Sequence, residues 1–326
     1  QIRRDFGPGR PAFSPTQLES LALCPFQFYL RHVLHLRPIE ERDELDDDRA
    51  TRGSVIHKAL EELHSVLRGP PTDTSATLAD QVAGNIEDVL IRVIGEGVRS
   101  GSEIDPGRSL IERGQLVKVG RRYALQYARY AEKAGLGAVG HEFEVIFGDP
   151  RTPKIPSLVL GQGLDAVPLQ GRIDRIDLVK NSGQTLFRII DYKTGYSPNK
   201  PDVDAGLALQ LPLYALAVER LALAGEAASP ADVGYWSLSE KGYKSVKTMT
   251  PIAKAKAELE TWETFREALE TYVLALVTHL RAARFPVAPR KDDCTRSCDF
   301  RAVCRIKQVR TIGKTWTDAP RLGTSQ

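Results

Sequence analysis

The sequence is poor in sulfur and contains no long apolar run. It has four cysteines and one methionine among 326 residues. No stretch reaches the length of a membrane span, and residues 1–15 contain no apolar core of a signal peptide. We therefore expect a cytoplasmic protein with no membrane partner. Because the chain begins at Gln1 and its only methionine is Met249, we also expect a domain from a longer polypeptide, or a processed chain.

The net charge is low as well. A formal charge of +3 does not by itself indicate a nucleic-acid partner, so any basic surface has to be local. Residues 281–310 form such a region, with nine Lys or Arg against three Asp. Residues 40–48 are almost wholly acidic, and this run predicts a solvated linker or loop.

Two short stretches, residues 171–177 and 188–195, predict the strands around which the chain is organised. In the first, isoleucines alternate with charged residues, and in the second an apolar run ends abruptly at Asp191. Residues 181–183, Asn-Ser-Gly, are typical of a tight turn. An antiparallel hairpin is the simplest connection, and it would place Asp174 beside Asp191.

Two adjacent carboxylates repel each other strongly at low effective dielectric unless a cation lies between them. Their hard oxygen atoms favour Mg²⁺ or Mn²⁺. Lys193 lies two residues after Asp191, so both side chains share one face of the strand, where the ammonium can hold and polarise a water molecule. The same residues also fit solvated strand-edge charges with an ordinary cross-strand pair, and an isolated D-x-K does not decide between the two.

The combined pattern is Gly-x-Ile-Asp-Arg-Ile-Asp, a turn, an apolar strand and Asp-Tyr-Lys-Thr-Gly. It resembles the metal-binding core of the RecB-like PD-(D/E)XK nucleases. The resemblance implies an α/β fold of the restriction-endonuclease type, with a mixed central sheet flanked by helices. It also implies a divalent ion held by Asp174, Asp191, the carbonyl of Tyr192 and His57, with Lys193 helping to orient or deprotonate water.

His57 adjoins an apolar helical stripe formed by Ile56, Leu60, Leu63 and Leu67. A histidine beside such a face is more often a surface or core residue than a ligand. However, residues 52–57 are similar to the R-G-x-x-x-H segment of the RecB-like nucleases. The assignment of His57 to the metal site follows from that similarity and not from its periodicity.

Gln210 and Tyr214 lie four residues apart and would share one face of a helix. Pro212 between them predicts a helix start or a kink, and core packing is the default role for both side chains. Q-x-x-x-Y after D-Y-K-T-G resembles the RecB-like signature. The resemblance implies that Gln210 and Tyr214 support the catalytic site and the nucleic acid.

The four cysteines are Cys24, Cys294, Cys298 and Cys304, one near the start and three within eleven residues near the end. Chance free thiols are not expected to cluster in this way. A disulfide framework is disfavoured in a cytoplasmic protein of this size, which leaves a Cys₄ zinc site or an iron–sulfur cluster. Spacing alone does not separate these two.

Two segments resemble AddB-type iron–sulfur nuclease domains, which share one distant N-terminal cysteine with three C-terminal ones. These segments are S-P-x-x-L followed by C-P-F-x-F-Y-L at residues 14–30, and C-D-F-R-A-V-C at residues 298–304. The resemblance implies a [4Fe–4S] cluster on all four cysteines, with Zn²⁺ as the alternative. Three residues separate Cys294 from Cys298, where two are expected in the family.

The remaining elements would form a scaffold around these motifs. Residues 14–17 predict a capped helix start, and Pro25 interrupts that helix. Residues 141–147 alternate like a strand, on which Glu142 or Glu144 can approach the metal. The other expected elements are helices at 78–98, 108–134, 205–223 and 251–284, a loop with one short strand at 148–170, and a strand at 232–238.

We expect one integrated domain with four parts. These are an N-terminal helical segment with the first cluster cysteine at 1–50, a helical region with the His57 helix at 51–138, the nuclease core at 139–250, and a long helix with the C-terminal cysteines at 251–326.

The predicted function is a metal-dependent DNA nuclease, a single-strand exonuclease of recombination or repair. Its expected partner is a helicase domain or subunit. The alternative is a nuclease-like domain that binds DNA or a helicase without cutting. Such a domain usually lacks a catalytic residue, whereas this sequence retains His57, Asp174, Asp191, Lys193, Gln210 and Tyr214.

Overall fold

A mixed five-stranded sheet forms the centre of the protein. This computed structural model describes residues 2–10, 12–37, 44–67, 78–99, 106–134, 140–181, 184–239, 242–249, 262–291, 294, 298–304, 316 and 319–322. The strand order is β1 (Gly140–Phe147), β4 (Gly171–Asn181), β5 (Gln184–Lys193), β6 (Ala228–Ser237) and β7 (Gly242–Thr248). The β5–β6 pair is parallel and the other pairs are antiparallel. The predicted mixed sheet and its β4–β5 hairpin are confirmed.

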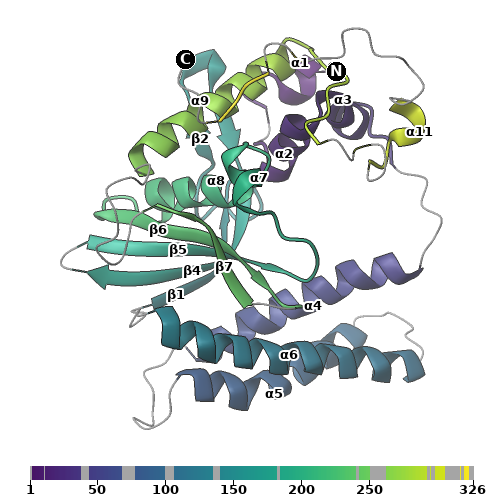
Figure 1. The fold of residues 1–326 in the computed structure, drawn as a ribbon, viewed down its shortest axis with the longest axis vertical. Coiled ribbons are helices and arrows are strands. Elements are labelled where there is room, and N and C mark those ends of the chain that lie inside the picture. Colours follow the sequence, from purple (N-terminus) through teal and green to yellow (C-terminus); the bar gives the residue numbers. More distant parts are fainter. Residues whose placement is uncertain are drawn as a thin grey trace.

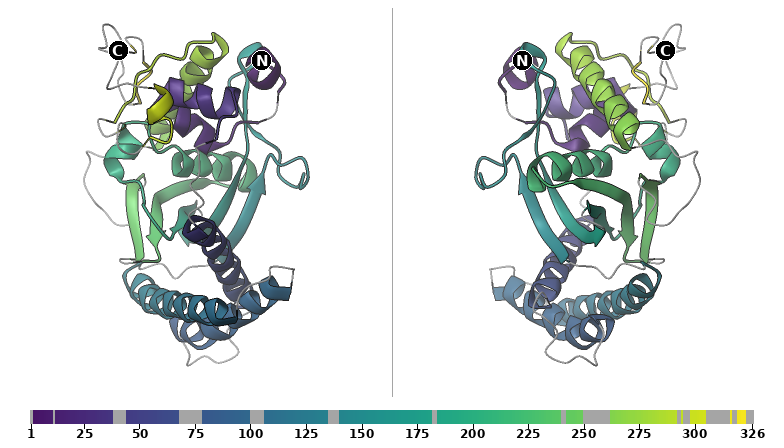
Figure 2. Two further views of the ribbon diagram at one scale, coloured as in Figure 1. Left: turned by 90° about the vertical axis from the view of Figure 1, so that its right-hand side faces the viewer. Right: turned by 90° about the vertical axis from the view of Figure 1, so that its left-hand side faces the viewer.

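Helices cover both faces of this sheet (Figures 1 and 2). One face packs against α2 (Pro15–Leu23), α8 (Gln210–Ala217) and α9 (Trp262–Arg281). The other packs against α4 (Glu44–Val66), α5 (Leu78–Arg99) and α6 (Pro106–Ala134), which we call the helical layer. Neighbouring residues of β5 serve the two cores in turn, because Ile189 faces the first and Ile190 the second. This two-sided burial accounts for the continuous apolar run that precedes Asp191.

The N-terminal segment follows the predicted signals closely. After α1 (Ile2–Phe6), Ser14 caps α2 in a capping box with Gln17. Pro25 stops α2 at Cys24 and begins α3 (Pro25–Phe28), which continues into a π-helical turn, Tyr29–Val33.

The helical layer contains one correction to the sequence-based expectations. The predicted linker or loop at residues 40–48 is wrong for residues 44–48, which belong to the first turns of α4. Acidic residues suit the start of a helix because the macrodipole is positive there. Residues 40–43 lie outside the described residues. Farther along α4, the predicted apolar stripe is buried at Ile56, Leu60 and Leu63.

The helix predicted at 205–223 starts later than expected. The short helix α7 (Lys200–Asp204) ends near Gly206, whose positive φ of 69° breaks the helical path. The helix α8 then begins at Gln210 and passes into a π-helical turn, Val218–Ala222. Leu209 caps α8 without a side-chain hydrogen bond of its own. Glu19 supplies the missing cap, since Oε1 accepts the N–H groups of Leu209 and Gln210 at 2.7 and 2.9 Å.

Three smaller differences concern the remaining elements. Two short strands, β2 (Leu158–Leu160) and β3 (Val167–Leu169), pair where one was predicted, with a 3₁₀ turn, Gly163–Asp165, between them. The edge strand β7 was not predicted. The described part of the long C-terminal helix begins at Trp262, and residues 251–261 lie outside the described residues. The last described helix is α11 (Arg301–Cys304). No described helix is both long and apolar enough to span a bilayer.

A buried ion pair joins the sheet to the helical layer. Arg175 on β4 is fully buried and donates to Asp177 at 2.5 and 2.9 Å. Tyr130 of α6 donates to the same carboxylate at 2.6 Å, and Arg175 also donates to the hydroxyl of Tyr123 at 3.2 Å. Because an unpaired charge there would be costly, this network fixes how α6 sits on β4.

Candidate active site

Asp174 and Asp191 lie side by side on β4 and β5. Arg175 is opposite Ile190 in the hairpin register, which brings Asp174 next to Asp191. The backbone N–H of Tyr192 donates to Asp174 Oδ2 at 2.9 Å. The Tyr192 side chain is buried in the core of the helical layer, so this residue can offer only backbone atoms to the carboxylate side.

Asp191 is the more buried of the two carboxylates. Gln210 Nε2 donates to its Oδ1 at 2.7 Å, and Lys193 Nζ lies 2.7 Å from its Oδ2. Burial raises the pKa of Asp191 to about 6, and the charge of Asp174 adds to this effect against the opposing charge of Lys193. The carboxylate is thus held in a site that disfavours its ionised form.

His57 reaches this carboxylate pair from α4. Its Nδ1 lies 3.3 Å from Asp174 Oδ1. Burial of the ring, the strongest single influence, acts to lower the pKa of His57. The contact with Asp174 and the charges of Asp174 and Asp191 outweigh it, and the pKa is raised overall. Imidazole and carboxylates therefore attract each other across the boundary between the helical layer and the sheet.

Glu144 forms a compact cluster with His57 and Asp174. One ligand atom from each of these three residues lies within 4.8 Å of the other two. Glu144 has a positive φ of 52°, which is uncommon for a residue other than glycine, and it is skipped in the β1–β4 pairing. Its carboxylate also contacts Arg172. Of the two glutamates proposed from the sequence, Glu144 thus lies at the site, and the side chain of Glu142 lies outside the described residues.

Gln210 and Tyr214 stand behind the carboxylates on α8. Besides its bond to Asp191, Gln210 contacts Lys193 Nζ through Oε1 and the Tyr214 hydroxyl through Nε2, each at 3.5 Å. Burial raises the pKa of Tyr214 to about 12, so the hydroxyl stays protonated at neutral pH. The Tyr214 ring packs edge-on against Phe147 at 6.0 Å between ring centres. Gln210 is therefore the residue that links Asp191, Lys193 and Tyr214.

This arrangement suits a hard divalent cation. The donors are carboxylate oxygens and one imidazole nitrogen, a set that Mg²⁺ and Mn²⁺ accept. Asp191 Oδ2 is buried and receives no well-directed hydrogen bond, although Lys193 Nζ lies close to it. A buried carboxylate oxygen without a donor costs free energy, and a cation bound beside it would remove that cost. The residues present therefore fit a divalent metal ion.

The family model for the PD-(D/E)XK nuclease superfamily matches residues 12–305. The chain belongs to this superfamily. Nucleases of the superfamily generally use divalent metals, in agreement with the donor set at Asp174. The predicted RecB-like resemblance is confirmed by this match.

Several curated relatives of this PD-(D/E)XK chain are named as the B-type polypeptide of an ATP-dependent helicase/deoxyribonuclease. The protein from Moorella thermoacetica is 34% identical over 270 residues, which is 79% of this chain and 22% of that protein. The one from Carboxydothermus hydrogenoformans is 28% identical over 368 residues, 95% of this chain and 33% of that protein. The one from Caldanaerobacter subterraneus is 28% identical over 264 residues, 79% and 21%. This chain thus spans between about a fifth and a third of these relatives.

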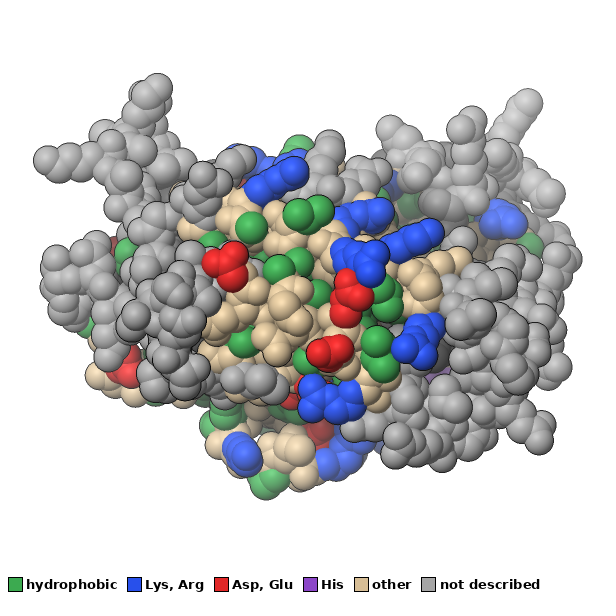
Figure 3. Space-filling model, turned by 90° about the horizontal axis from the view of Figure 1, so that it is seen from below, with side chains coloured by type: hydrophobic (Ala, Val, Ile, Leu, Met, Phe, Trp, Pro, Cys, Tyr) green, Lys and Arg blue, Asp and Glu red, His purple; other side chains and the backbone are tan. Residues whose placement is uncertain are grey.

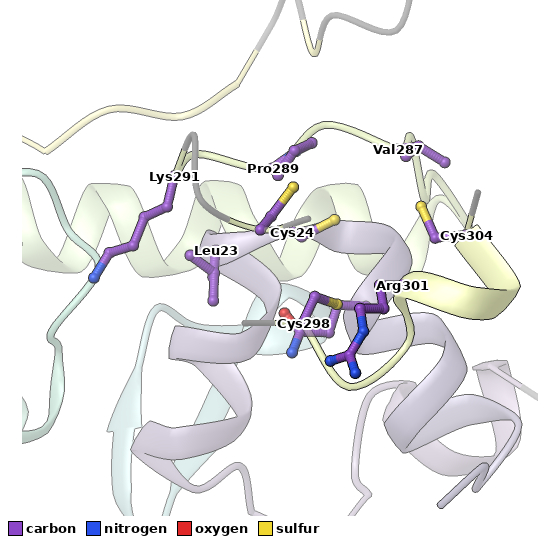
Figure 4. A pocket seen from close by; sticks show the side chains of 10 residues that line it. Leu23, Cys24, Val287, Pro289, Lys291, Cys298, Arg301 and Cys304 are labelled. Carbon is purple, nitrogen blue, oxygen red and sulfur yellow. The ribbon is translucent and has the colours of Figure 1, made fainter. Parts of the chain in front are cut away.

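The four cysteines of this PD-(D/E)XK chain line one cavity of about 90 Å³ (Figure 4). Cys24 follows α2, whereas Cys294, Cys298 and Cys304 come from the segment after α9. The two ends are also tied by the ion pair of Arg31 with Asp299 and by the bond from the Arg290 N–H to the Leu23 carbonyl at 2.9 Å. The N-terminal and C-terminal cysteines, far apart in the sequence, are therefore neighbours in the fold.

Backbone amides surround the Cys24 sulfur. Burial raises the pKa of the Cys24 thiol, while hydrogen bonds from the N–H groups of Gln27, Ala288 and Phe26 act in the opposite direction. Such amides stabilise a thiolate, which is the form that binds metals. The local chemistry at Cys24 therefore fits a metal ligand.

The spacing of the sulfurs is wide for a single ion. A tetrahedral zinc site with Zn–S bonds of about 2.3 Å holds its sulfurs about 3.8 Å apart. Among the residues that the structure describes, no three cysteine sulfurs lie within 4.8 Å of one another. A cavity needs about 10–15 Å³ to hold one water molecule. The cysteine cavity, at about 90 Å³, therefore has room for a body larger than one ion.

Some basic residues suggested by the sequence for phosphate contact have structural roles instead. Lys and Arg side chains gather on the outer face of the helical layer, with acidic ones beside them (Figure 3). Arg121 pairs with Glu87 at 2.5 and 3.1 Å, and Arg122 donates to the carbonyl of Ser239. Arg129 is exposed, and the side chain of Lys133 lies outside the described residues. This face therefore supports no DNA contact for Arg121 or Arg122.

Sequence reasoning missed two residues that shape the site. Glu19 holds the start of α8, and with it Gln210, although the two residues are 191 positions apart in the chain. Arg172 contacts Glu144 from the next strand, 28 positions away. Neither pair has a spacing that would reveal it in a single sequence. The four-residue spacing of Gln210 and Tyr214, by contrast, is a local signal.

Proposed function

We propose that this chain is a Mg²⁺- or Mn²⁺-dependent deoxyribonuclease that hydrolyses phosphodiester bonds in single-stranded DNA from an end, in recombination or repair. The observation that carries the proposal is the convergence of His57, Asp174, Asp191, Lys193 and Gln210 from α4, β4, β5 and α8 into one contact network. Several elements of the fold thus supply a carboxylate pair, an imidazole and an ammonium to one point.

Asp174, Asp191, His57 and the carbonyl of Tyr192 would hold the metal, and Glu144 is a further donor at the same place. When bound, the ion would supply positive charge that stabilises the negative charge developing on the phosphate. Lys193, held beside Asp191, orients a water molecule and assists its deprotonation. Gln210 fixes Asp191 and Lys193 relative to each other, and Tyr214 supports Gln210.

We further propose that Cys24, Cys294, Cys298 and Cys304 hold a [4Fe–4S] cluster with a structural role. The wide sulfur spacing and the cavity volume support a cluster over the Zn²⁺ alternative. A bridge from Cys24 to Cys294 would close a loop of about 270 residues and so remove much conformational entropy from the unfolded chain. The four-part layout of one integrated domain, with parts ending at residues 50, 138, 250 and 326, remains our proposal.

The partner we propose is a helicase, either on the same polypeptide or as a separate subunit. The names of the relatives and the fraction of their length that this chain covers support it. A cytoplasmic location fits DNA repair, and we retain it as part of the proposal.

The test is digestion of end-labelled linear and circular single strands with Mg²⁺, Mn²⁺ or EDTA. Metal-dependent loss of the linear substrate alone supports an exonuclease. Lys193→Ala and Gln210→Ala, compared with the remote surface variant Arg151→Ala, separate this site from a contaminating nuclease. Cleavage that survives Lys193→Ala unchanged would refute the proposed site.

A further inference from the structure

The chain just beyond Lys193 forms an open surface. Thr194, Gly195 and Tyr196 are all exposed, and the aromatic ring of Tyr196 is unusual in being 71% accessible to solvent. Three residues of chain span at most about 11 Å. Tyr196 therefore lies within about one or two nucleotides of any phosphate held beside Lys193.

The Tyr196 ring is exposed but anchored. Its hydroxyl donates to Asp202 Oδ2 at 2.9 Å. Lys291 Nζ lies 3.1 Å from the other oxygen of Asp202 and 5.8 Å from the centre of the Tyr196 ring. The ring is thus oriented through its polar end, with a cation beside it, while most of its surface faces solvent.

A second tyrosine connects this ring to the carboxylate site. Lys193 Nζ lies 5.5 Å from the centre of the Tyr235 ring. The pKa of Tyr235 is raised first by burial and then by nearby acidic groups that include Asp191 and Asp202, and Tyr196 acts in the same direction. Tyr235 is therefore close both to the metal-binding carboxylates and to the exposed ring.

We propose that Tyr196 is a stacking platform for a base of single-stranded DNA next to the scissile phosphate, with Lys291 facing an adjoining backbone phosphate. Exposed aromatic rings with a cation beside them are how proteins hold single strands without reading sequence. An exposed tyrosine also suits a protein contact. The neighbouring cation and the short distance to Lys193 favour DNA. The inference rests on the proposed nuclease function and assigns it a substrate-positioning residue.

The position of Lys291 links this platform to the cysteines. Lys291 lines the cysteine cavity, three residues before Cys294. Figure 4 shows its side chain extending away from the sulfur atoms, so its backbone belongs to the cysteine segment and its ammonium to the Asp202 side. Order in the cysteine segment therefore sets the place of a DNA contact.

The experiment measures binding of a fluorescent single strand to the full chain in EDTA, and cleavage in Mg²⁺. Base stacking on an aromatic ring changes affinity by about 5- to 150-fold. Tyr196→Leu should weaken binding within that range and raise KM more than it lowers kcat. Tyr196→Phe keeps the ring and should stay within about twofold to threefold of wild type. Leu164→Ala, at a side chain that is 78% exposed on the β2–β3 connection, is the matched control.

A strand with one abasic nucleotide walked along its length identifies the stacked base. At one position the abasic site should weaken wild-type binding and leave Tyr196→Leu unaffected. Lys291→Gln should lower the slope of log K against log salt by about 0.7, as expected for one phosphate contact on a single strand. An unchanged slope would overturn the assignment of Lys291.

Two failures are distinguishable. If Tyr196→Leu binds every strand as tightly as wild type while wild type cuts DNA, the stacking platform is wrong and the nuclease function stands. If wild type cuts no DNA with either metal ion, the proposed function fails, whatever the binding data show.

Discussion

Replacing Asp191 by asparagine should make the metal-free protein more stable while abolishing cleavage. The pKa of Asp191 is raised from 3.8 to about 6. The folded state therefore binds this proton more tightly than the unfolded state does. The stability that this group contributes is present below pH 3.8 and is lost as pH rises through about 6.

The size of the effect follows from that pKa shift. A shift of about 2 units corresponds to about 3 kcal/mol, which the ionised Asp191 costs the folded protein at pH 8. Asparagine avoids this cost and keeps an oxygen for the bond from Gln210, but its NH₂ group then faces the Lys193 ammonium. We assign about 1 kcal/mol to that unfavourable contact, so the expected net gain is about 2 kcal/mol. With about 2.1 cal/mol/K of unfolding entropy per residue, this raises Tm by about 3 °C.

The assay is thermal and urea unfolding of wild type and Asp191→Asn in EDTA at pH 8 and pH 4.5. The difference should be about 2 kcal/mol at pH 8 and nearly absent at pH 4.5, where Asp191 is mostly protonated. Asp204→Asn is the control of opposite sign. Burial acts to raise the pKa of Asp204, but bonds and charges from Lys247 and Lys200 outweigh it and lower the pKa. That variant should lose stability at pH 8. An Asp191→Asn protein less stable than wild type at pH 8 would refute the reasoning.

Three further perturbations test the rest of the structure. His57→Ala should raise the Mg²⁺ concentration for half-maximal cleavage without abolishing activity, since water can replace one ligand; an unchanged Mg²⁺ titration would return His57 to a structural role. Asp177→Asn leaves the fully buried Arg175 unpaired and should cost about 3–5 kcal/mol in urea unfolding, most of it regained in Arg175→Met/Asp177→Leu; equal stability of the single variant and wild type would contradict the proposed lock between sheet and helical layer. Cys298→Ala should give a colourless and less stable protein when purified without oxygen, and iron, sulfide and zinc analysis decides the metal, because stoichiometric zinc without iron would exclude the cluster.

The parts of the site that the sequence could predict are those with short spacing. The hairpin needs only a turn between two strands, so the adjacency of Asp174 and Asp191 follows from about twenty residues of pattern. His57 and Gln210 could be placed only through the family resemblance, because periodicity treats them as ordinary helix residues. The four cysteines could be grouped because cysteine is rare in this chain.

The rest depends on contacts between distant segments. The start of α8 is set by the carboxylate of Glu19, 190 positions before Leu209, which no local propensity contains. Glu144 could be named but not chosen over Glu142, since the choice depends on a backbone distortion at φ 52°. The edge strand β7 is polar at alternate positions and lies against α7 and α6, so its identity comes from its neighbours.

The metal site lies across a seam between two bodies. His57 belongs to the helical layer, whereas Asp174 and Asp191 belong to the sheet, and α4 meets the sheet mainly along its edge strand β1. An ion held by both sides would act as a clasp that draws them together. A slight rocking of the helical layer would move the imidazole away from the carboxylates. A macromolecule that grips the outer face of α5 and α6 would then be able to arm or disarm the nuclease from a distance, without touching a single catalytic atom.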